Sequence, residues 1–298
     1  MAWSQRVLQL LHRMNSFHAQ GSIKCLCKPF YVGGQRVGSV PPGVLPHLGR
    51  YPGVFLVDEG LSRVELSSGL GGYSERSEAL DVVLREWKEE KLFDCLEGWR
   101  DEKYEVMGRS CDPPLMNMER AATSLFGVKR YGVHLNGFVR RSDGQMSMWI
   151  GRRALSKPTY PGMLDNMAAG GLAAGLGIKE ALVKECAEEA CVPERLAARA
   201  QPAGTVSYCY EDGTGIFAEC QFVYDLEVPT DFTPTVGDGE VQEFYLWPLQ
   251  QVRDAIVDSD FKPNCALVVL DFMIRHGFIQ PDTERYYHQF VEGLHTTL

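Results

Sequence analysis

Apolar positions alternate with polar or small ones in two adjacent segments near the middle of the chain. Residues 132–139 and 146–150 both follow a period of two, and residues 142–144 between them, Ser-Asp-Gly, are typical of a turn. We therefore expect an antiparallel β-hairpin here. Further strands are predicted at the short apolar runs 53–57, 204–210, 221–226 and 243–246.

Other segments repeat their apolar residues every three or four positions, which is the spacing of one helix face. This pattern predicts helices at 74–93 and 178–190, and a closing helix at 264–276 that Gly277 ends. An opening helix is predicted from Val7, Leu8, Leu10, Leu11 and Met14. The succession of strands and helices indicates an α/β (α+β) protein.

Composition places the chain among folded proteins. Its 298 residues are 45% hydrophobic and 23% charged. Thirty basic and 39 acidic side chains give a net charge of −9, so no protein-wide positive field attracts a nucleic-acid polymer. No run approaches the roughly 18 apolar residues of a membrane helix, so we expect no membrane association. Nine scattered cysteines without a CxxC pair favour reduced thiols.

The start of the chain differs from the rest in charge. Residues 1–57 carry six basic side chains and no acidic one. A basic amphipathic start over residues 1–20 is typical of an organelle-targeting segment, but it equally suits the first helix of a fold. We expect a cytoplasmic protein, with a mitochondrion or another organelle as the alternative.

The predicted helix at 178–190 carries a cluster of carboxylates. Glu185, Glu188 and Glu189 are spaced i, i+3 and i+4, so all three project from one face. Carboxylate oxygens are the ligands that Mg²⁺ prefers, and the ion keeps further positions for water and phosphate. The cluster therefore predicts a site for Mg²⁺ or Mn²⁺. The alternative is a solvated helix face, on which Lys184 pairs with Glu180 and Glu188.

Glycines precede this helix. Gly170, Gly171 and Gly175 predict a loop whose backbone comes close to phosphate and offers N–H groups to it. Together with the carboxylates, this loop favours binding of a metal-complexed phosphate compound.

The stretch from Gly170 to Val192 resembles the Nudix box, whose pattern is G-x5-E-x7-R-E-U-x-E-E-x-G-U, where U is a bulky apolar residue. The resemblance implies that Glu185, Glu188 and Glu189 bind the catalytic metal ions. Three positions depart from the pattern: Leu176 replaces the early glutamate, Lys184 the arginine and Cys191 the late glycine.

Longer segments are similar to the thiamine-pyrophosphokinase-related Nudix proteins, which include plant plastid and fungal members. The segments are GWRxExY (98–104), FGVxxYGVHLNGF (126–138), RRxxxKxTYPGMLDNxxAGG (152–171), DGEV (238–241) and FKPNCALVxLDFxIRHG (261–277). This resemblance implies a Nudix α/β/α sandwich with a mixed sheet at 119–298. It also implies a smaller mixed α/β domain of unknown function at 1–118, which we expect to cap the pocket or to form an interface, such as that of a homodimer.

Nudix chemistry is the attack of water on one phosphorus of a diphosphate, and it needs a base. Glu240 in a glycine-rich turn is our candidate for this base, with Glu188 and Glu189 as alternatives. Cations that can hold phosphate follow the predicted hairpin: Arg152, Arg153 and Lys157. Adjacent strand residues point to opposite faces, so we expect one arginine of the pair to reach the site.

Aromatic residues can stack on a flat ring of the substrate. The candidates are Tyr160, Trp149, Phe126 and Tyr208, although each also suits a hydrophobic core. His134, on an alternating strand, is expected to be a structural histidine.

Three functions follow from these observations. The favoured one is a Mg²⁺-dependent pyrophosphatase that cleaves a small diphosphate to its monophosphate. The resemblance points to oxidised thiamine diphosphate derivatives or to oxidised nucleoside diphosphates such as 8-oxo-dGDP. One alternative is a hydrolase of ADP-ribose, NADH or similar dinucleotides. The other, suggested by the three departures from the box, is a catalytically weak binding or regulatory protein.

Overall fold

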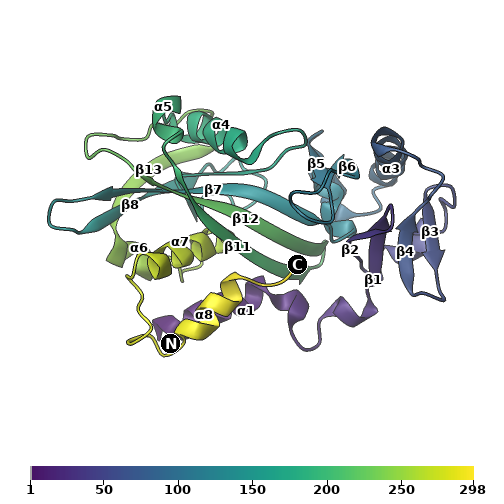
Figure 1. Ribbon diagram of the computed structural model, residues 1–298, viewed down its shortest axis with the longest axis horizontal. Coiled ribbons are helices and arrows are strands. Elements are labelled where there is room, and N and C mark those ends of the chain that lie inside the picture. Colours follow the sequence, from purple (N-terminus) through teal and green to yellow (C-terminus); the bar gives the residue numbers. More distant parts are fainter. Residues whose placement is uncertain (1) are drawn as a thin grey trace.

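A mixed seven-stranded β-sheet forms the centre of the protein in a computed structural model, which describes residues 2–298. Five strands follow the order β11-β12-β7-β8-β13, while β10 pairs with β7 and β9 with β8 (Figure 1). The strands are β7 (Lys129–Arg140), β8 (Met146–Arg153), β9 (Leu164–Asp165), β10 (Ala168–Gly171), β11 (Gln201–Asp212), β12 (Gly215–Glu227) and β13 (Val241–Pro248).

The predicted hairpin is the pair β7 and β8, but the two strands pair only near the turn. Phe138–Arg140 faces Met146–Met148, and beyond this point the strands separate. The short strands β9 and β10 fill the gap, each antiparallel to its neighbour. On its other edge β7 runs parallel to β12, so the sheet is mixed.

Helices cover both faces of this sheet (Figure 1). One face carries α4 (Ile178–Ala190) and α5 (Glu194–Ala197). The other carries α6 (Leu249–Ala255), α7 (Pro263–Arg275), α8 (Tyr287–Leu294) and α1 (Trp3–Met14). Both faces are therefore apolar, because Val133 and Leu135 pack under α4 while Phe138 packs under α7. The α/β/α sandwich expected from the sequence is confirmed.

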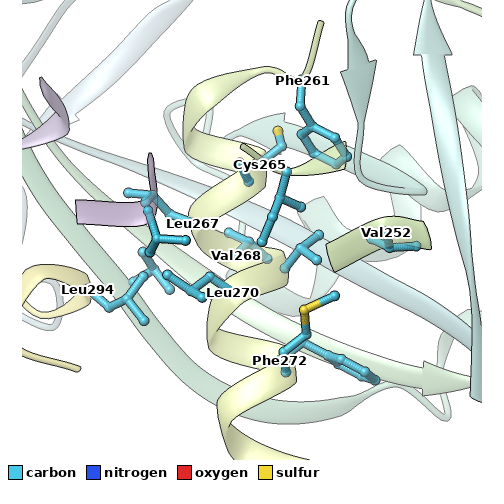
Figure 2. Packing of buried hydrophobic residues seen from close by; sticks show 14 of the residues in the cluster. Val252, Phe261, Cys265, Leu267, Val268, Leu270, Phe272 and Leu294 are labelled. Carbon is cyan, nitrogen blue, oxygen red and sulfur yellow. The ribbon is translucent and has the colours of Figure 1, made fainter. Parts of the chain in front are cut away.

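Helix α7 is the most deeply embedded helix of this arrangement. Ten of its 13 residues are buried, so its sequence is apolar on nearly every side. Figure 2 shows its side chains, among them Leu267, Leu270 and Phe272, pointing in several directions into the surrounding core. Leu294 of α8 reaches the same core.

The N-terminal part, from β1 (Lys28) to the 3-10 helix that ends at Leu125, has its own mixed α/β structure beside one end of the large sheet (Figure 1). A four-stranded sheet has the order β2-β1-β4-β3, and a separate hairpin is formed by β5 and β6. The elements are β1 (Lys28–Val32), β2 (Gln35–Val40), α2 (Leu45–Leu48), β3 (Phe55–Asp58), β4 (Arg63–Leu66), α3 (Tyr73–Glu89), β5 (Lys103–Val106) and β6 (Met116–Glu119). Four short 3-10 helices lie at Ser16–His18, Ile23–Leu26, Asp94–Gly98 and Arg120–Leu125.

Two features bear on how this part joins the rest. Its core, built around Trp87 and Phe30, extends to Val128. Helix α1 instead packs against α7 and α8, in the core of the large sheet. The domain boundary at residues 118/119 remains a prediction. Met1, with which the suggested targeting segment begins, lies outside the described residues.

The other predicted elements are present, with somewhat different ends. The helices expected at 74–93, 178–190 and 264–276 are α3, α4 and α7. The strands expected at 53–57, 204–210, 221–226 and 243–246 are β3, β11, β12 and β13. One local expectation is wrong: Gly170 and Gly171 belong to strand β10 and not to a loop. Within residues 2–298, no helix combines the length and apolarity that crossing a membrane requires.

Candidate active site

A cavity of about 880 Å³ lies where the N-terminal part meets the large sheet. Its walls include Glu185, Glu188 and Glu189 of α4. Gly170 and Gly171 of β10 line it as well. The structure thus brings the residues of the predicted carboxylate cluster and the paired glycines to one cavity.

Glu189 is the most buried of the three carboxylates, with 6% of its surface exposed. Its Oε2 accepts a hydrogen bond of 2.9 Å from the backbone N–H of Ala169. Burial, with a smaller contribution from the negative charges of Asp165 and Glu185, raises the pKa of Glu189 to about 8. No salt-bridge partner of Glu189 is found among residues 2–298.

Glu185 is mostly buried and lies against the backbone of β10. Its side chain fills the space next to Gly170 that a Cβ atom would need. Burial raises the pKa of Glu185; Lys184 opposes this shift, and the charges of Glu188 and Glu240 add to it. Gly170 is therefore required by the approach of this side chain.

Glu188 is half-exposed and paired. The Nζ atom of Lys184 lies 2.8 Å from its Oε2 and 3.7 Å from Oε1 of Glu185. The expected pair between Lys184 and Glu188 is thus present. A lysine at this position compensates part of the negative charge of the cluster.

The chemistry of these side chains suits a hard divalent cation. In the part of the chain that the structure describes, no group of three or more His, Cys, Asp or Glu side chains is already arranged to hold a metal ion. However, three carboxylates on one helix face border a cavity, and two of them have raised pKa values because burial and like charges disfavour ionisation. A bound cation would relieve that cost, and these carboxylates are the residues that would hold it.

Arg152 and Arg153 point to opposite sides of β8, as the alternation of a strand predicts. Arg152 binds Asp260 and the carbonyl of Gly162 and does not line the cavity. Arg153 lines the cavity, but its guanidinium donates to the carboxylate of Asp165 at 2.8 Å and to the carbonyls of Thr159 and Tyr160. Its bonds hold the loop before β9 against the sheet.

Lys157 and Tyr160 come from this loop and line the cavity. Lys157 is paired with Glu240, which lines the cavity too. Tyr160 has a left-handed backbone with φ of 52°. The predicted phosphate-binding lysine and the predicted base therefore form a direct ion pair in the wall of the pocket.

A cluster of buried polar side chains around Asp165 lies next to the cavity. Asp165 lies between Arg153 and Lys262 and accepts a hydrogen bond from the thiol of Cys265. Burial opposes the ionisation of Asp165, but Lys262 and Arg153 outweigh it and lower its pKa. The sequence motifs contain Asp165, Lys262 and Cys265, but pattern alone assigned them no role.

His134, which we expect to be structural, is buried and lines the cavity. Its Nδ1 is 2.8 Å from the side-chain oxygen of Asn166, and burial lowers the pKa of His134 to about 4. The ring is therefore neutral at physiological pH.

Aromatic side chains of β11 and β12 line another side of the cavity. Tyr210 and Phe217 stack with their ring centres 4.6 Å apart. Beside them Tyr208 donates a hydrogen bond of 2.6 Å to Glu219, which also pairs with Arg130. Of the aromatic residues named from the sequence, Tyr160 and Tyr208 line the cavity, whereas Trp149 and Phe126 lie in the cores.

The N-terminal part supplies the remaining wall, to which sequence reasoning assigned no site residue. Arg100, Glu102, Tyr104 and Arg120 all line the cavity. Three of these residues, Arg100, Glu102 and Tyr104, belong to the segment GWRxExY, whose pattern indicates a family resemblance but no particular chemistry.

Comparison with known families agrees with this geometry. Residues 130–265 match the NUDIX domain, and residues 6–130 match a domain of unknown function, DUF4743. The chain is 40% identical to Nudix hydrolase 24, chloroplastic, of Arabidopsis thaliana over 259 residues, or 87% of this chain and 70% of that protein. It is also 40% identical to Nudix hydrolase 20, chloroplastic, of the same plant over 266 residues, again 87% and 70%.

Solved structures similar to the chain include the NUDIX domain of NrtR from Shewanella oneidensis in complex with ADP ribose. The identity is 16% and the TM-score 0.41, over 51% of this chain and 90% of that one. The extent of the sequence matches shows the family: this chain belongs to the Nudix hydrolases and is an enzyme of the hydrolase class. Nudix hydrolases act on small diphosphate compounds and generally use divalent metal ions such as Mg²⁺.

Proposed function

We propose that the enzyme cleaves a small diphosphate to its monophosphate in the presence of Mg²⁺ or Mn²⁺. Oxidised thiamine diphosphate derivatives are the first candidates, since the sequence resembles the thiamine-pyrophosphokinase-related subfamily, to which we assign it. Oxidised nucleoside diphosphates such as 8-oxo-dGDP are the related class. The observation that supports this proposal best is that the box carboxylates and the stacked pair Tyr210 and Phe217 line one cavity.

The proposed reaction is substitution at phosphorus. Water attacks one phosphorus, the bond to the bridging oxygen breaks, and the products are a monophosphate and inorganic phosphate. Glu185, Glu188 and Glu189 would hold the metal, which neutralises phosphate charge and lowers the pKa of bound water when it is present. Glu240, kept close by Lys157, takes the proton from water, and Glu188 and Glu189 are its competitors for this role.

The rest of the substrate is bound by the protein walls. Gly170 and Gly171 border the phosphate end of the cavity, and Lys157, Tyr160 and Arg153 border its loop side. Because the donors of Arg153 already bind Asp165 and two loop carbonyls, we assign it the positioning of Lys157 and Tyr160. Arg152 does not line the cavity, so we no longer assign it a direct contact with the substrate. It donates a hydrogen bond to the carbonyl of Gly162 and can affect the substrate only by positioning this loop.

An ADP-ribose- or NADH-type dinucleotide is the second candidate substrate. The volume of about 880 Å³ favours it, since this value is near the upper end of the range for small-molecule sites and leaves room for a second ring.

The test is release of phosphate and formation of monophosphate by the purified protein, with and without Mg²⁺. The substrates are thiamine diphosphate, its oxidised forms, 8-oxo-dGDP, ADP-ribose and NADH. Metal-dependent conversion of a terminal diphosphate supports the proposal. Conversion of ADP-ribose or NADH alone replaces it by the second candidate. No turnover of any compound by folded protein contradicts both.

Two further proposals concern the setting of the enzyme. We propose a cytoplasmic location, and the basic first 57 residues make an organelle the alternative. Fractionation of cells that express the full chain separates the two. We also propose a homodimer, which sedimentation equilibrium at micromolar concentration tests directly.

A further inference from the structure

The segment GWRxExY of the N-terminal part forms one wall of the cavity. Four of its five specified residues, Gly98, Arg100, Glu102 and Tyr104, line the pocket, and Trp99 does not. Arg120, which begins the 3-10 helix after β6, lines it beside them. A segment that had no assigned role thus faces the catalytic helix.

This segment contacts strand β10 and the loop that follows it. The ring of Tyr104 occupies the space next to Gly171, where a Cβ atom would lie 2.7 Å from its Cζ. The backbone N–H of Ala174 donates a hydrogen bond of 2.8 Å to the carbonyl of Lys103. The side chain of Glu185 packs against Gly170, and the side chain of Tyr104 packs against Gly171. These adjacent glycines therefore position helix α4 and the N-terminal segment relative to each other.

The two arginines of the wall differ in their partners. Arg120 donates a hydrogen bond of 2.7 Å to Glu102 and lies over the ring of Tyr104. For the side chain of Arg100, residues 2–298 offer no ion pair and no hydrogen bond. Burial and the neighbouring charge of Arg120 lower the pKa of Arg100. The carboxylates of Glu102 and Glu240 oppose this shift only in part, and a bound anion would favour the charged form of Arg100 further.

The other cations at the site are already engaged. Arg153 binds Asp165 and two carbonyls, Lys157 pairs with Glu240, and Lys262 pairs with Asp165. An incoming phosphate group must therefore break an existing pair to bind these residues. Arg100 has its donors available, and guanidinium groups match phosphate oxygens in two-point hydrogen bonds.

We infer that Arg100, beside the ion pair of Arg120 and Glu102, binds the terminal phosphate of the substrate, so that the N-terminal part completes the active site. This inference rests on the proposed function. A terminal phosphate has three free oxygens and more negative charge than the bridging phosphates of a dinucleotide. Arg100 therefore selects terminal diphosphates over ADP-ribose and NADH.

The test compares Arg100→Gln with wild-type protein. Arg109→Gln is the matched control, because Arg109 is an exposed arginine of the same part of the chain and does not line the cavity. With thiamine diphosphate or 8-oxo-dGDP and Mg²⁺, we expect Arg100→Gln to lower kcat/KM about 10- to 100-fold, mainly through KM. Activity on ADP-ribose should change less than threefold, and Arg109→Gln should match wild type.

A binding experiment makes the inference independent of turnover. Methylenediphosphonate, a diphosphate analogue that is not hydrolysed, is titrated into each protein by calorimetry in Mg²⁺. Weaker binding by about tenfold or more in Arg100→Gln, but not in Arg109→Gln, supports the inference even if no substrate is turned over. If wild type turns over a diphosphate and Arg100→Gln equals it in KM and in binding, the inference fails and the proposed function stands. If wild type neither binds nor hydrolyses, both fail.

Discussion

The carboxylate of Glu185 rests against the backbone of Gly170, in the space that a Cβ atom would occupy. Glu185 lies on helix α4, and Gly170 lies on strand β10. Their contact links the catalytic helix to the sheet. The first glycine of the box is therefore needed for the placement of a carboxylate, in addition to any approach of phosphate.

Replacement of Gly170 by alanine should displace Glu185. Because the displaced group is a flexible side chain, we expect the free energy of unfolding to change by no more than about 1 kcal/mol. Activity should fall at least about tenfold, since a misplaced catalytic group costs rate without costing stability. Gly177→Ala is the control, because a Cβ there meets no atom closer than 3.9 Å. Equal activity of both variants would refute the link.

Glu188→Gln tests the predicted metal site. Glu188 is half-exposed, with Lys184 as its ion-pair partner, so the substitution should leave the fold unchanged. We expect kcat to fall at least about 100-fold, as for the loss of a ligand to a catalytic metal. Initial rates at several Mg²⁺ concentrations provide the measurement. Glu194→Gln, at an exposed glutamate that does not line the cavity, should behave as wild type. A normal rate in Glu188→Gln would exclude this residue from metal binding.

The longer helices and strands could be predicted because they depend on local periodicity, whereas short elements such as β5, β6 and α6 were not predicted. Helix α4 begins and ends where the pattern placed it, at 178 and 190. Its carboxylate cluster could also be predicted, since i, i+3 and i+4 spacing is a property of the helix itself. The strand β10 could not, because the four residues Ala168–Gly171 form a strand only through pairing with β7.

The rest of the site depends on contacts between distant segments. Nothing near Arg153 in the sequence shows that Asp165 and two loop carbonyls bind its donors. Likewise, Arg100 reaches the cavity only because Tyr104 docks on Gly171. The sequence therefore predicted helix α4 and its carboxylate cluster, but it predicted as phosphate ligands cations whose donors are already bound.

Glu240→Gln tests the candidate base. If Glu240 takes the proton from water, kcat should fall about 10²- to 10⁴-fold while KM changes little. Lys157→Gln removes its partner and serves as the comparison, because Lys157 pairs with Glu240 in the cavity. A rise in KM alone in both variants would show that the pair holds substrate and that the base is another residue. Glu243→Gln, at an exposed residue of β13, the strand that follows Glu240, is the control for folding.

Cys191 offers a test of backbone strain. It follows the last residue of α4 with φ of 49°, a left-handed conformation that glycine adopts readily and other residues do not. The Nudix box has glycine here. We expect Cys191→Gly to stabilise the protein by about 0.5–1 kcal/mol. This value is the free-energy cost of a left-handed conformation at a non-glycine residue, minus the larger conformational entropy that glycine loses on folding. Cys191→Ala keeps the strain and should give no gain in urea unfolding. Equal stability of the two variants would contradict this explanation.

Acid stability should depend on Asp225, where β12 meets the end of α7. Its carboxylate accepts bonds from Arg275 at 2.6 Å, His276 at 2.9 Å and Asn136 at 3.1 Å, and Arg275 also binds Asp271. Burial alone would raise the pKa of Asp225, but these partners, Arg275 above all, lower it below the ordinary 3.8. A lowered pKa in the folded state adds stability that is present above the unfolded-state value and is lost as the pH falls through the folded-state value.

Asp225→Asn should therefore cost about 1–3 kcal/mol in the free energy of unfolding at pH 7. The difference from wild type should shrink below about pH 4, since this carboxylate is then protonated first in the unfolded state and, at lower pH, in the folded state as well. Urea unfolding at pH 7, 5, 4 and 3 measures both effects. Asp282→Asn, at an exposed aspartate, should show neither of them. A difference between Asp225→Asn and wild type that stays constant down to pH 3 would show that packing, and not the charge of Asp225, stabilises this junction.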